Sequence, residues 1–534
     1  MPRCSVLTDL RTAPLPADAG DAVVVVGSGA AGIALATTLG AAGRRVLLLE
    51  SGGDVADATA IGRGDALNGG VADALPFNGL GEGRARVLGG TTQLWHGQCM
   101  RLHEIDVAPR PWVARSGWPL SLAELGPWYE RAEEWLDVSG RGYGPDRWSE
   151  HPGLPPLAWD GDHLLHDFTE YMRQPYLGTE HRAALAASSH VEVLLHATVA
   201  RVRTSDGAAT GLEVVLPDGT RRELAAREVV LAAGSIENAR LLQLSDADGV
   251  GLGEGREHTG RHLQDHPIIR TAEVLPRDFR VLQDRYVVLR RDGRRLFPKV
   301  RLAPRAQEEH GLLDATAVFV HEHAHPGLEA SRRLLQAARR RTAPPHLLRE
   351  VATAATAAPA VARTAYRRLA RGMAIGERPS HVWLQLWVEQ APQPDRRVRL
   401  AEEVDAHGLP RARVTWTCDD LELETTRRLT RWVADDLRRL GVAEVRELPS
   451  MADDAAWRST VTDAAHPAGT TRMALDPADG VVGTDLEVHG VRGLSVVGGS
   501  VFPTSGYANP TLTIVALALR LAARLEGREA VRGA

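Results

Sequence analysis

Residues 21–50, DAVVVVGSGAAGIALATTLGAAGRRVLLLE, have the pattern of a strand, a glycine-rich turn, a helix and a second strand. Val23–Val26 is short, β-branched and apolar throughout, which favours a buried parallel strand. The G-x-G-x-x-G over Gly27–Gly32 then allows a tight turn, the approach of a pyrophosphate to the backbone, and close packing of the helix on the strand. Glu50, at the end of the second strand, can accept hydrogen bonds from ribose hydroxyls. These features predict a bound dinucleotide, FAD or NAD rather than NADP, because an acid there disfavours a 2′-phosphate.

The composition is that of a globular protein with two or three domains. The chain has 534 residues, of which 44% are hydrophobic and 25% are charged, and its net charge of −5 gives no reason to expect nucleic acid. There is no secretory pattern and no apolar run that could span a bilayer, so we expect a cytoplasmic protein without a membrane partner. Cys4, Cys99 and Cys418 are too few and too dispersed for a disulfide framework or a thiolate metal site. The only lysine, Lys299, lies outside any motif for Schiff-base or phosphoryl chemistry.

The pattern changes several times after the first hundred residues. Trp112–Leu136 is amphipathic, with Ser121 and Glu124 as a capping box, and predicts a helix. Short strands then follow as an antiparallel meander, before a buried strand and a helix over Glu228–Ser245 return to the nucleotide-binding domain. The predicted meander strands are 191–195, 199–204, 211–216 and 222–225.

Residues 271–449 predict a separate domain of strands with an inserted helical segment at 326–371. This segment is rich in alanine and arginine, and we interpret it as a solvated helical excursion or a subunit contact, with docking of an acidic partner as the alternative. Three histidines, His321, His323 and His325, would share one face of an extended segment. No further spaced ligand accompanies them, so no metal site is predicted.

The strand His381–Glu389, HVWLQLWVE, alternates between apolar and polar side chains. Trp383, Gln385 and Trp387 therefore share one face, which is aromatic and polar and suits stacking and hydrogen bonding to a sugar-like ligand. The alternative is an ordinary amphipathic strand whose tryptophans belong to a secondary core.

Two motifs lie near the end of the chain. His466–Met473 reads HPAGTTRM, and residues 500–513 read SVFPTSGYANPTLT and lead into an apolar helix over Thr511–Leu525. Asn509 followed by Pro510 is typical of a helix N-cap with proline at the first helical position. A purely structural role is therefore the alternative to a chemical one for Asn509, as a loop histidine bound to a carbonyl is for His466.

Together these motifs resemble the glucose–methanol–choline (GMC) oxidoreductases, flavoproteins that oxidise alcohols. The motifs occur in the family's order from about residue 20 to 530, which makes the match specific. The matching pieces are GSGAAG with Glu50, VLGGTTQLWHG (87–97), VVLAAGSIENARLLQLS (229–245), TGRHLQDHP (259–267), EQAPQPDRRVRL (389–400), HPAGTTRM and SVFPTSGYANPTLT.

The resemblance implies an α/β fold in which a discontinuous Rossmann-like FAD-binding domain is joined to an α+β substrate-binding domain with an antiparallel sheet. The FAD-binding domain would comprise residues 20–105, 190–267 and 452–530, and the substrate-binding domain residues 106–189 and 268–451. The implied FAD-binding residues are Gly27, Gly29, Ala31, Gly32, Glu50, Gly89, Gly90, Thr91, Trp95, Val199, Ala233, Gly499, Ser500, Pro510 and Thr511.

Two departures from the family pattern concern the cofactor. Sugar-oxidising members that attach the flavin covalently have a histidine directly before the loop tryptophan, whereas Leu94 precedes Trp95 here and His96 follows it. FAD is therefore predicted to be non-covalent. The family also commonly has an acid in the flavin-binding turn, where this chain has Gly498-Gly499-Ser500.

The resemblance places His466 and Asn509 at the family's active-site pair. A neutral imidazole at His466 would take the hydroxyl proton while hydride leaves the carbinol carbon, and the Asn509 amide would hold the developing alkoxide. The helix N-terminus near Pro510–Thr511 would face the flavin. The predicted substrate contacts are Trp383, Gln385, Trp387 and Tyr507.

The motif details are similar to those of bacterial members that act on sugars and glycosides, and an aminoglycoside hydroxyl is a further hypothesis. The expected partners are a small-molecule alcohol and O₂ or another electron acceptor, while the oligomeric state stays open. The alternative functions are a non-redox flavoprotein lyase and a non-catalytic flavin-binding subunit.

Overall fold

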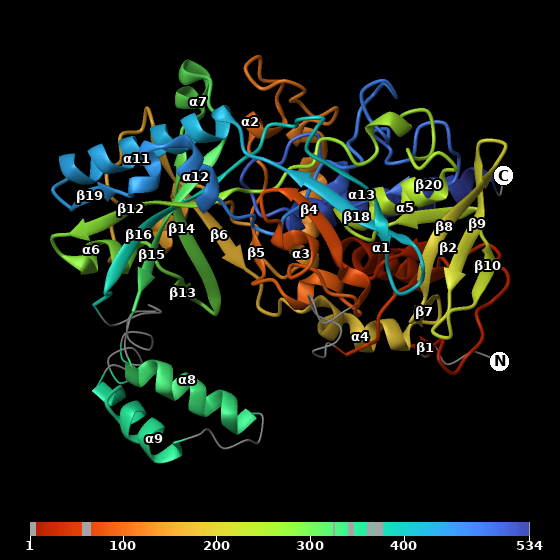
Figure 1. Ribbon diagram of the computed structural model, residues 1–534, viewed down its shortest axis with the longest axis horizontal. Coiled ribbons are helices and arrows are strands. Elements are labelled where there is room, and N and C mark those ends of the chain that lie inside the picture. The colour runs from red at the N-terminus through yellow and green to blue at the C-terminus, as the bar shows by residue number, and fades with distance from the viewer. Residues whose placement is uncertain are drawn as a thin grey trace.

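The computed structural model describes residues 7–55, 66–323, 326–339, 346–359, 362, 366 and 378–532. A parallel sheet and a larger, mainly antiparallel sheet lie next to each other along the long axis of the molecule, on the right and left of Figure 1. Among the described residues, none of the helices combines the length and the apolar character needed to cross a membrane.

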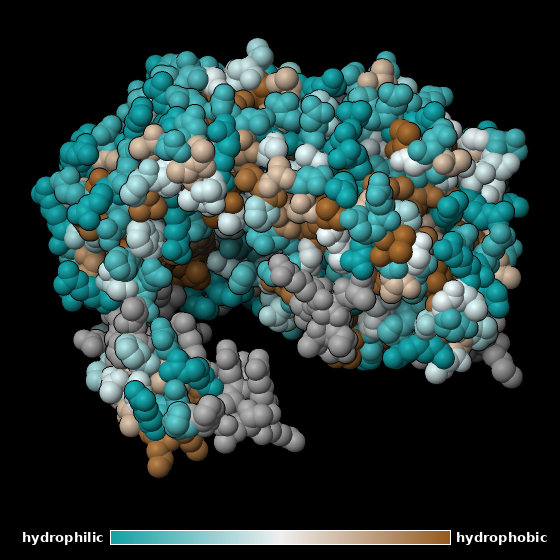
Figure 2. All heavy atoms as spheres, viewed as in Figure 1, coloured by the Kyte–Doolittle hydropathy of each residue, from teal (hydrophilic) through white to brown (hydrophobic). Residues whose placement is uncertain are grey.

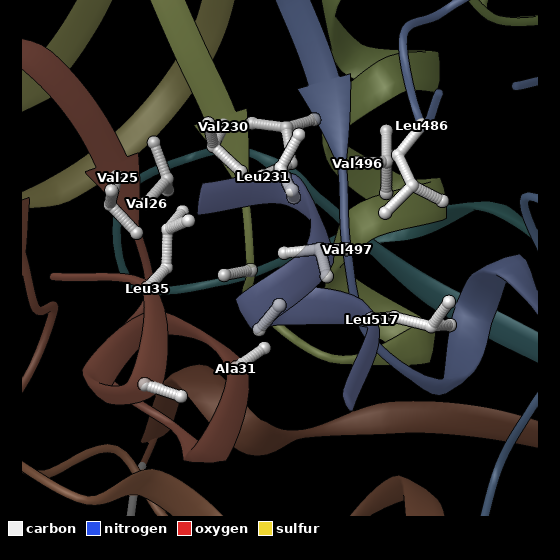
Figure 3. Packing of buried hydrophobic residues seen from close by; sticks show 14 of the residues in the cluster. Val25, Val26, Ala31, Leu35, Val230, Leu231, Leu486, Val496, Val497 and Leu517 are labelled. Carbon is white, nitrogen blue, oxygen red and sulfur yellow. The ribbon is translucent and has the colours of Figure 1, made fainter. Parts of the chain in front are cut away.

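The six-stranded parallel sheet combines strands from the beginning, middle and end of the chain. In spatial order its strands are β1 (Thr8–Asp9), β7 (Val191–Leu195), β3 (Val46–Leu49), β2 (Val23–Val26), β11 (Glu228–Leu231) and β20 (Leu494–Val496). The helices α1 (Ala30–Ala41) and α13 (Thr511–Arg532) pack against each other beside it. Figure 3 shows Val25, Val230 and Val496 of three neighbouring strands with Leu35 of α1 and Leu517 of α13. The predicted buried strand at β2 is confirmed, because its side chains are at most 7% exposed.

Glycines determine how α1 meets the sheet. Gly27 has φ +99°, and a Cβ there would lie 2.7 Å from the Ala232 carbonyl oxygen of the neighbouring strand. A Cβ at Gly32 would overlap the Gly27 carbonyl oxygen, whereas a Cβ at Gly29 would meet nothing within 4 Å. Gly27 and Gly32 are therefore required for packing, and Gly29 leaves an open space at the N-terminus of α1.

The eight-stranded sheet has an apolar face and a polar face. Its main path is β19 (Ala443–Glu447), β12 (Ile268–Pro276), β16 (His381–Val388), β15 (Ala315–Glu322), β14 (Arg294–Leu302), β6 (Leu164–Tyr171) and β5 (Gln98–Cys99), with β13 (Leu289–Arg291) paired to β14. Leu384 and Leu386 of β16 belong to one buried cluster with Leu429 and Val433 of α11 (Asp420–Arg439), which covers the apolar face. The predicted alternation of β16 is confirmed.

Two three-stranded sheets complete the architecture. One contains β10 (Arg221–Ala225), β9 (Ala208–Val215) and β8 (Thr198–Ser205), and the other β17 (Arg397–Val404), β18 (Pro410–Trp416) and β4 (Gly70–Ala74). The remaining α-helices of the central body are α2 (Glu104–Val107), α3 (Leu122–Trp135), α4 (Leu177–Ala187), α5 (Ser235–Ser245), α6 (Phe279–Arg285), α7 (Pro304–His310) and α12 (Asp454–Thr460).

The predicted helical excursion projects away from this body. The helices α8 (Pro326–Arg339) and α9 (Leu347–Ala355) pack on each other as a hairpin at the lower left of Figure 1. Figure 2 shows an apolar patch at the lower end of this hairpin. Leu348 of α9 is 86% exposed. Other parts of 326–371, and His325 of the predicted histidine group, lie outside the described residues.

The structure corrects two local predictions. The sequence predicts β7 as part of the antiparallel meander, but β7 pairs in parallel with β3 and β1. It is buried like the central strands of the parallel sheet. His196, at φ +58°, turns the chain directly after it. Within the amphipathic stretch from Trp112, the helix begins at Leu122, directly after the predicted cap Ser121. The part of this stretch before the cap is not helical, and Gly117 there has φ +98°. The predicted capping box of Ser121 and Glu124 is confirmed.

The domain boundaries remain a prediction. β4 and β5 fall inside the predicted segment 20–105, yet they pair with β18 and β6 from the other part of the chain.

Replacing Gly32 with alanine is expected to destabilise the fold, because the added methyl group overlaps the Gly27 carbonyl. A cost of about 1–3 kcal/mol or more in the free energy of unfolding is expected for such overpacking. Denaturant unfolding of apoprotein measures it, with Gly29→Ala as the matched control in the same motif. Equal destabilisation by both substitutions would contradict the packing argument.

Candidate active site

Two C-terminal motifs and an earlier loop meet at one place. The HPAGTTRM segment runs beside the loop after β20, where the Gly469 N–H donates to the Gly499 carbonyl at 3.0 Å and the Thr471 N–H to the Ser500 carbonyl at 2.8 Å. On its other side, Ala468 pairs with Gln264 as an antiparallel bridge. The fold therefore gathers these motifs around residue 466.

A buried carboxylate fixes the backbone that carries His466. Asp265, fully buried, accepts hydrogen bonds from the backbone N–H groups of Ala464 at 3.0 Å, His466 at 2.9 Å and His266 at 2.7 Å. Burial, followed by the charge of Asp463, raises the pKa of Asp265 well above its usual range, whereas these hydrogen bonds lower it. Asp265 belongs to the TGRHLQDHP motif, but the sequence alone predicts no role for it.

His466 is paired with a second histidine that the sequence analysis did not single out. Its Nδ1 lies 3.1 Å from Nδ1 of His266. Burial, with a further contribution from the charge of Lys299, lowers the pKa of His466 to about 4. Burial, followed by the charges of His466 and Lys299, lowers the pKa of His266 well below its usual range. Both rings are therefore neutral near pH 7, and one Nδ1 donates to the other.

The polar face of the eight-stranded sheet forms the wall beside this pair. The Trp387 ring lies 5.9 Å from the His466 ring, measured between centroids. Lys299 Nζ lies 5.4 Å from the centre of the Trp387 ring and 5.7 Å from that of Tyr507. The Tyr507 hydroxyl donates to Asp167. The structure thus brings the predicted Trp387 and Tyr507 together near His466, and adds Lys299 and Asp167.

The other predicted substrate contacts lie further along the strand. Trp383 stacks on His381 and donates through Nε1 to Glu322 at 2.6 Å, near the start of β16. Gln385 lies between the two tryptophans, is half-buried, and pairs with Val318 of β15. These two side chains share the strand face of Trp387 but not its contact with His466.

Asn509 does not cap the final helix. The first hydrogen bond of α13 runs from the Ile514 N–H to the Pro510 carbonyl, so Pro510 occupies the N-cap position. Asn509 is 6% exposed, and its Oδ1 accepts no hydrogen bond from the part of the chain that the structure describes. The predicted structural role is therefore not found, and the amide stays available for a ligand.

The dinucleotide motif has the form that a bound nucleotide requires. α1 begins after Gly29 without a side-chain cap, which leaves backbone N–H groups free at the helix N-terminus. The Glu50 carboxylate is buried beside them, where it accepts from Ser28 Oγ at 2.5 Å and from the Gly52 N–H at 2.8 Å. Burial raises its pKa, although these hydrogen bonds lower it. The Ser28 N–H and Ser51 Oγ also donate to it, at 3.3 Å and 3.4 Å. A carboxylate accepts up to four hydrogen bonds, so a ribose hydroxyl would take the place of one of these longer ones.

Other predicted cofactor residues lie around this motif. A Cβ at Gly90 would lie 3.1 Å from the Gly29 Cα, and the Gly89 N–H donates to the Ser28 carbonyl. The Ala233 N–H donates to Asn238, which also donates to Ser500 Oγ at 3.0 Å. Of the remaining positions, Ala31 and Gly499 are buried, Val199, Trp95, Pro510 and Thr511 half-buried, and Thr91 exposed.

A second buried polar cluster lies behind Tyr507. His103 Nε2 pairs with Asp167 at 2.8 Å, and the potential ligand atoms of His103, Asp106 and Asp314 lie within 4.8 Å of one another. The sequence analysis did not identify this cluster. A cavity of about 890 Å³ between α3 and β6 reaches His103 and Asp167, but His466 does not line it.

Known families match almost the whole chain. The FAD dependent oxidoreductase family matches residues 22–385, and the GMC oxidoreductase family, through its C-terminal part, matches residues 392–518. The chain belongs to the FAD-dependent oxidoreductases, and its C-terminal part matches the GMC oxidoreductases that its motifs resemble.

Several characterised relatives match most of the chain. Paromamine 6′-oxidase of Streptomyces fradiae is 25% identical over 95% of this chain and 91% of its own. The 2-methyl-1,2-propanediol dehydrogenase of Mycolicibacterium austroafricanum is 24% identical over 81% of this chain and 79% of its own. C-glycoside 3-oxidase of Microbacterium trichothecenolyticum is 28% identical over 68% of this chain and 56% of its own.

Solved structures share the fold. A formate oxidase superposes with a TM-score of 0.57 at 20% identity, over 96% of this chain and 99% of its own. Pyridoxine 4-oxidase from Mesorbium loti superposes with a TM-score of 0.55 at 18% identity, over 95% of this chain and 99% of its own.

Gly29→Ala is expected to weaken FAD binding without affecting the folded apoprotein, because its methyl group enters the open space at the start of α1. About tenfold weaker binding corresponds to a modest steric cost of about 1.4 kcal/mol. Titration of apoprotein with FAD measures this change. Unaltered affinity would show that the nucleotide does not approach Gly29.

Proposed function

We propose that this protein oxidises a hydroxyl group of a sugar-type alcohol, with His466 as the base. The observation that supports this most directly is the neutral His466–His266 pair beside Trp387. It provides a proton acceptor next to an aromatic surface on which an alcohol can be placed.

His466 accepts the substrate proton through Nε2. We assign the shared hydrogen to Nδ1 of His466, so that it donates to Nδ1 of His266 and leaves the Nε2 lone pair free. When Nε2 takes the hydroxyl proton, the imidazolium that forms strengthens its hydrogen bond to the neutral His266. FAD, when bound, supplies the acceptor for the hydride that leaves the carbinol carbon.

Asn509 is proposed to hold the substrate oxygen as its negative charge develops. An amide N–H₂ donates hydrogen bonds without competing for the proton, and the unoccupied Oδ1 can accept from a neighbouring hydroxyl. Trp387 is proposed to support the sugar ring by contact with its apolar face.

FAD is proposed to be bound without a covalent link, held by the residues around α1 and Glu50. His96 is exposed, and the neighbouring Trp95 is fixed by a hydrogen bond from Nε1 to the Pro175 carbonyl at 2.6 Å. Neither observation favours a histidine tether in this loop.

The proposed substrate class is inferred from the relatives together with the aromatic and polar face of β16. The names of two relatives, paromamine 6′-oxidase and C-glycoside 3-oxidase, describe oxidation of an aminoglycoside-type and a glycoside compound. All three relatives are named as oxidases or dehydrogenases, which favours oxidation over the lyase alternative. The electron acceptor is proposed to be O₂ or another small oxidant.

Anaerobic addition of the correct alcohol is expected to bleach the flavin absorbance near about 450 nm. The panel runs from simple sugars and glycosides to aminoglycoside pseudodisaccharides, with reoxidation by air as the test for an oxidase. His466→Ala is expected to lower the rate of flavin reduction by about 10²–10⁴-fold, as removal of a general base does. Normal flavin content with an unchanged rate would contradict the assignment of His466.

Activity is expected to persist at mildly acidic pH. A base must be neutral, and the pKa of His466 is lowered to about 4, so kcat/KM should be retained between neutral pH and about 5 and lost through about 4. Stopped-flow reduction over this range measures the acid limb. A limb near the ordinary histidine value of 6.5 would show that His466 is solvated in the working enzyme.

A further inference from the structure

The only lysine of the chain is buried in the wall of the active site. Lys299 is 1% exposed and lies on β14, opposite Asp167 of β6 in the strand register. Its Nζ has no hydrogen-bond partner among the residues that the structure describes, and it rests on the rings of Trp387 and Tyr507. Burial of an ammonium without a partner is costly, even where aromatic rings offset part of the cost. Because burying this ammonium is costly, its position calls for a functional explanation.

The carboxylate nearest in the register does not neutralise this charge by a close ion pair. Asp167 accepts a hydrogen bond from Tyr507, pairs with His103 at 2.8 Å and lies 3.9 Å from Arg301. Its Oδ1 also accepts from the Phe168 N–H at 3.0 Å, so Asp167 is engaged by four other groups. The Lys299 charge consequently acts on the neighbouring groups. These include His466, because the centre of the Trp387 ring lies 5.4 Å from Lys299 Nζ and 5.9 Å from the centre of the His466 ring.

Several titratable groups surround His466 and Lys299. His266 and Asp265 contact His466 from the loop before β12, and Asp463 acts on Asp265 from the segment before His466. His103, Arg301, Asp167 and Tyr507 lie on the Lys299 side of the wall. Burial is the largest cause of the lowered pKa of His466. Of the groups named here, Lys299 is the one whose charge lowers this pKa further.

We propose that Lys299 is a positioning residue that acts through His466. Its ammonium, held against Trp387 and Tyr507, keeps the His466 imidazole in the neutral form that accepts the substrate proton. This inference rests on the proposed function, in which His466 is the base. The charge is itself titratable, because burial lowers the pKa of Lys299 to about 8 although Asp167 raises it. Above that pH the ammonium deprotonates and His466 is released from its influence.

Lys299→Met keeps the length of the side chain and removes the charge. The acid limb of kcat/KM is expected to move up by about one pH unit, because His466 then binds a proton more readily. Lys299→Arg keeps the charge and should keep the acid limb of the wild-type enzyme. The matched control is Arg305→Met on α7, which removes an exposed cation shortly after the same strand.

The outcomes separate this inference from the proposed function. An acid limb that stays in place in Lys299→Met while His466→Ala is inactive overturns the role of Lys299 alone. An active His466→Ala overturns the proposed function itself. A limb that moves equally in Arg305→Met shows a general effect of net charge and also overturns the role of Lys299.

The single lysine allows a second readout that does not depend on turnover. Holoenzyme produced with lysine labelled with ¹³C at Cε has one ε-methylene site to observe, and Lys299→Met assigns its NMR signal. The expected pH titration has its midpoint near about 8. A midpoint at the ordinary value of 10.5 would show a solvated ammonium and overturn the proposal, even if Lys299→Met does not fold.

Discussion

The geometry of the active site depends on one buried carboxylate. Asp265 binds the backbone N–H groups of Ala464 and His466, about 200 positions later in the chain. Between them Ala465 has φ +55°, a conformation that residues with a side chain rarely adopt, and its own N–H is bound by Asp463. Intramolecular hydrogen bonds contribute about 0.5–1.5 kcal/mol each, so these three together can hold one residue in a conformation that costs about 1–3 kcal/mol. His466 is therefore positioned by Asp265 from a distant part of the chain, together with the nearby Asp463.

The two sheets differ in what their side chains do. In the parallel sheet both faces are apolar, and packing of α1 and α13 supplies stability, while the loops at the strand ends contain the predicted cofactor-binding residues. In the eight-stranded sheet one face packs on α11, whereas the other contains Asp167, Lys299 and Arg301. The second sheet thus encloses charged groups whose pKa values are shifted by burial and by one another. The face that packs on α11 contributes to stability, and the opposite face contains the charged groups near His466.

The sequence predicted the features that depend on neighbouring residues. The strand β2, the capping box of Ser121, the alternation of β16 and the strand–helix unit at β11 and α5 are all local patterns. The features that were missed depend on contacts between distant segments. β7 looks like part of a meander until its parallel partners are known, and His266 and Lys299 gain their significance only from the fold. A single lysine in an arginine-rich chain can be recognised in the sequence, but the sequence does not show that this side chain is buried beside Trp387.

The strand order of the parallel sheet also determines when that sheet can be completed during synthesis. Its first dinucleotide-binding strand, β2, is made early, but β20 and the helix α13 that packs on α1 come from residues 494–532. Domains generally fold as units while the chain is translated from the N-terminus. Here β2 lacks the complete sheet, and α1 lacks its partner helix, until residues 494–532 have been made, so the parallel sheet cannot be completed before that point of synthesis.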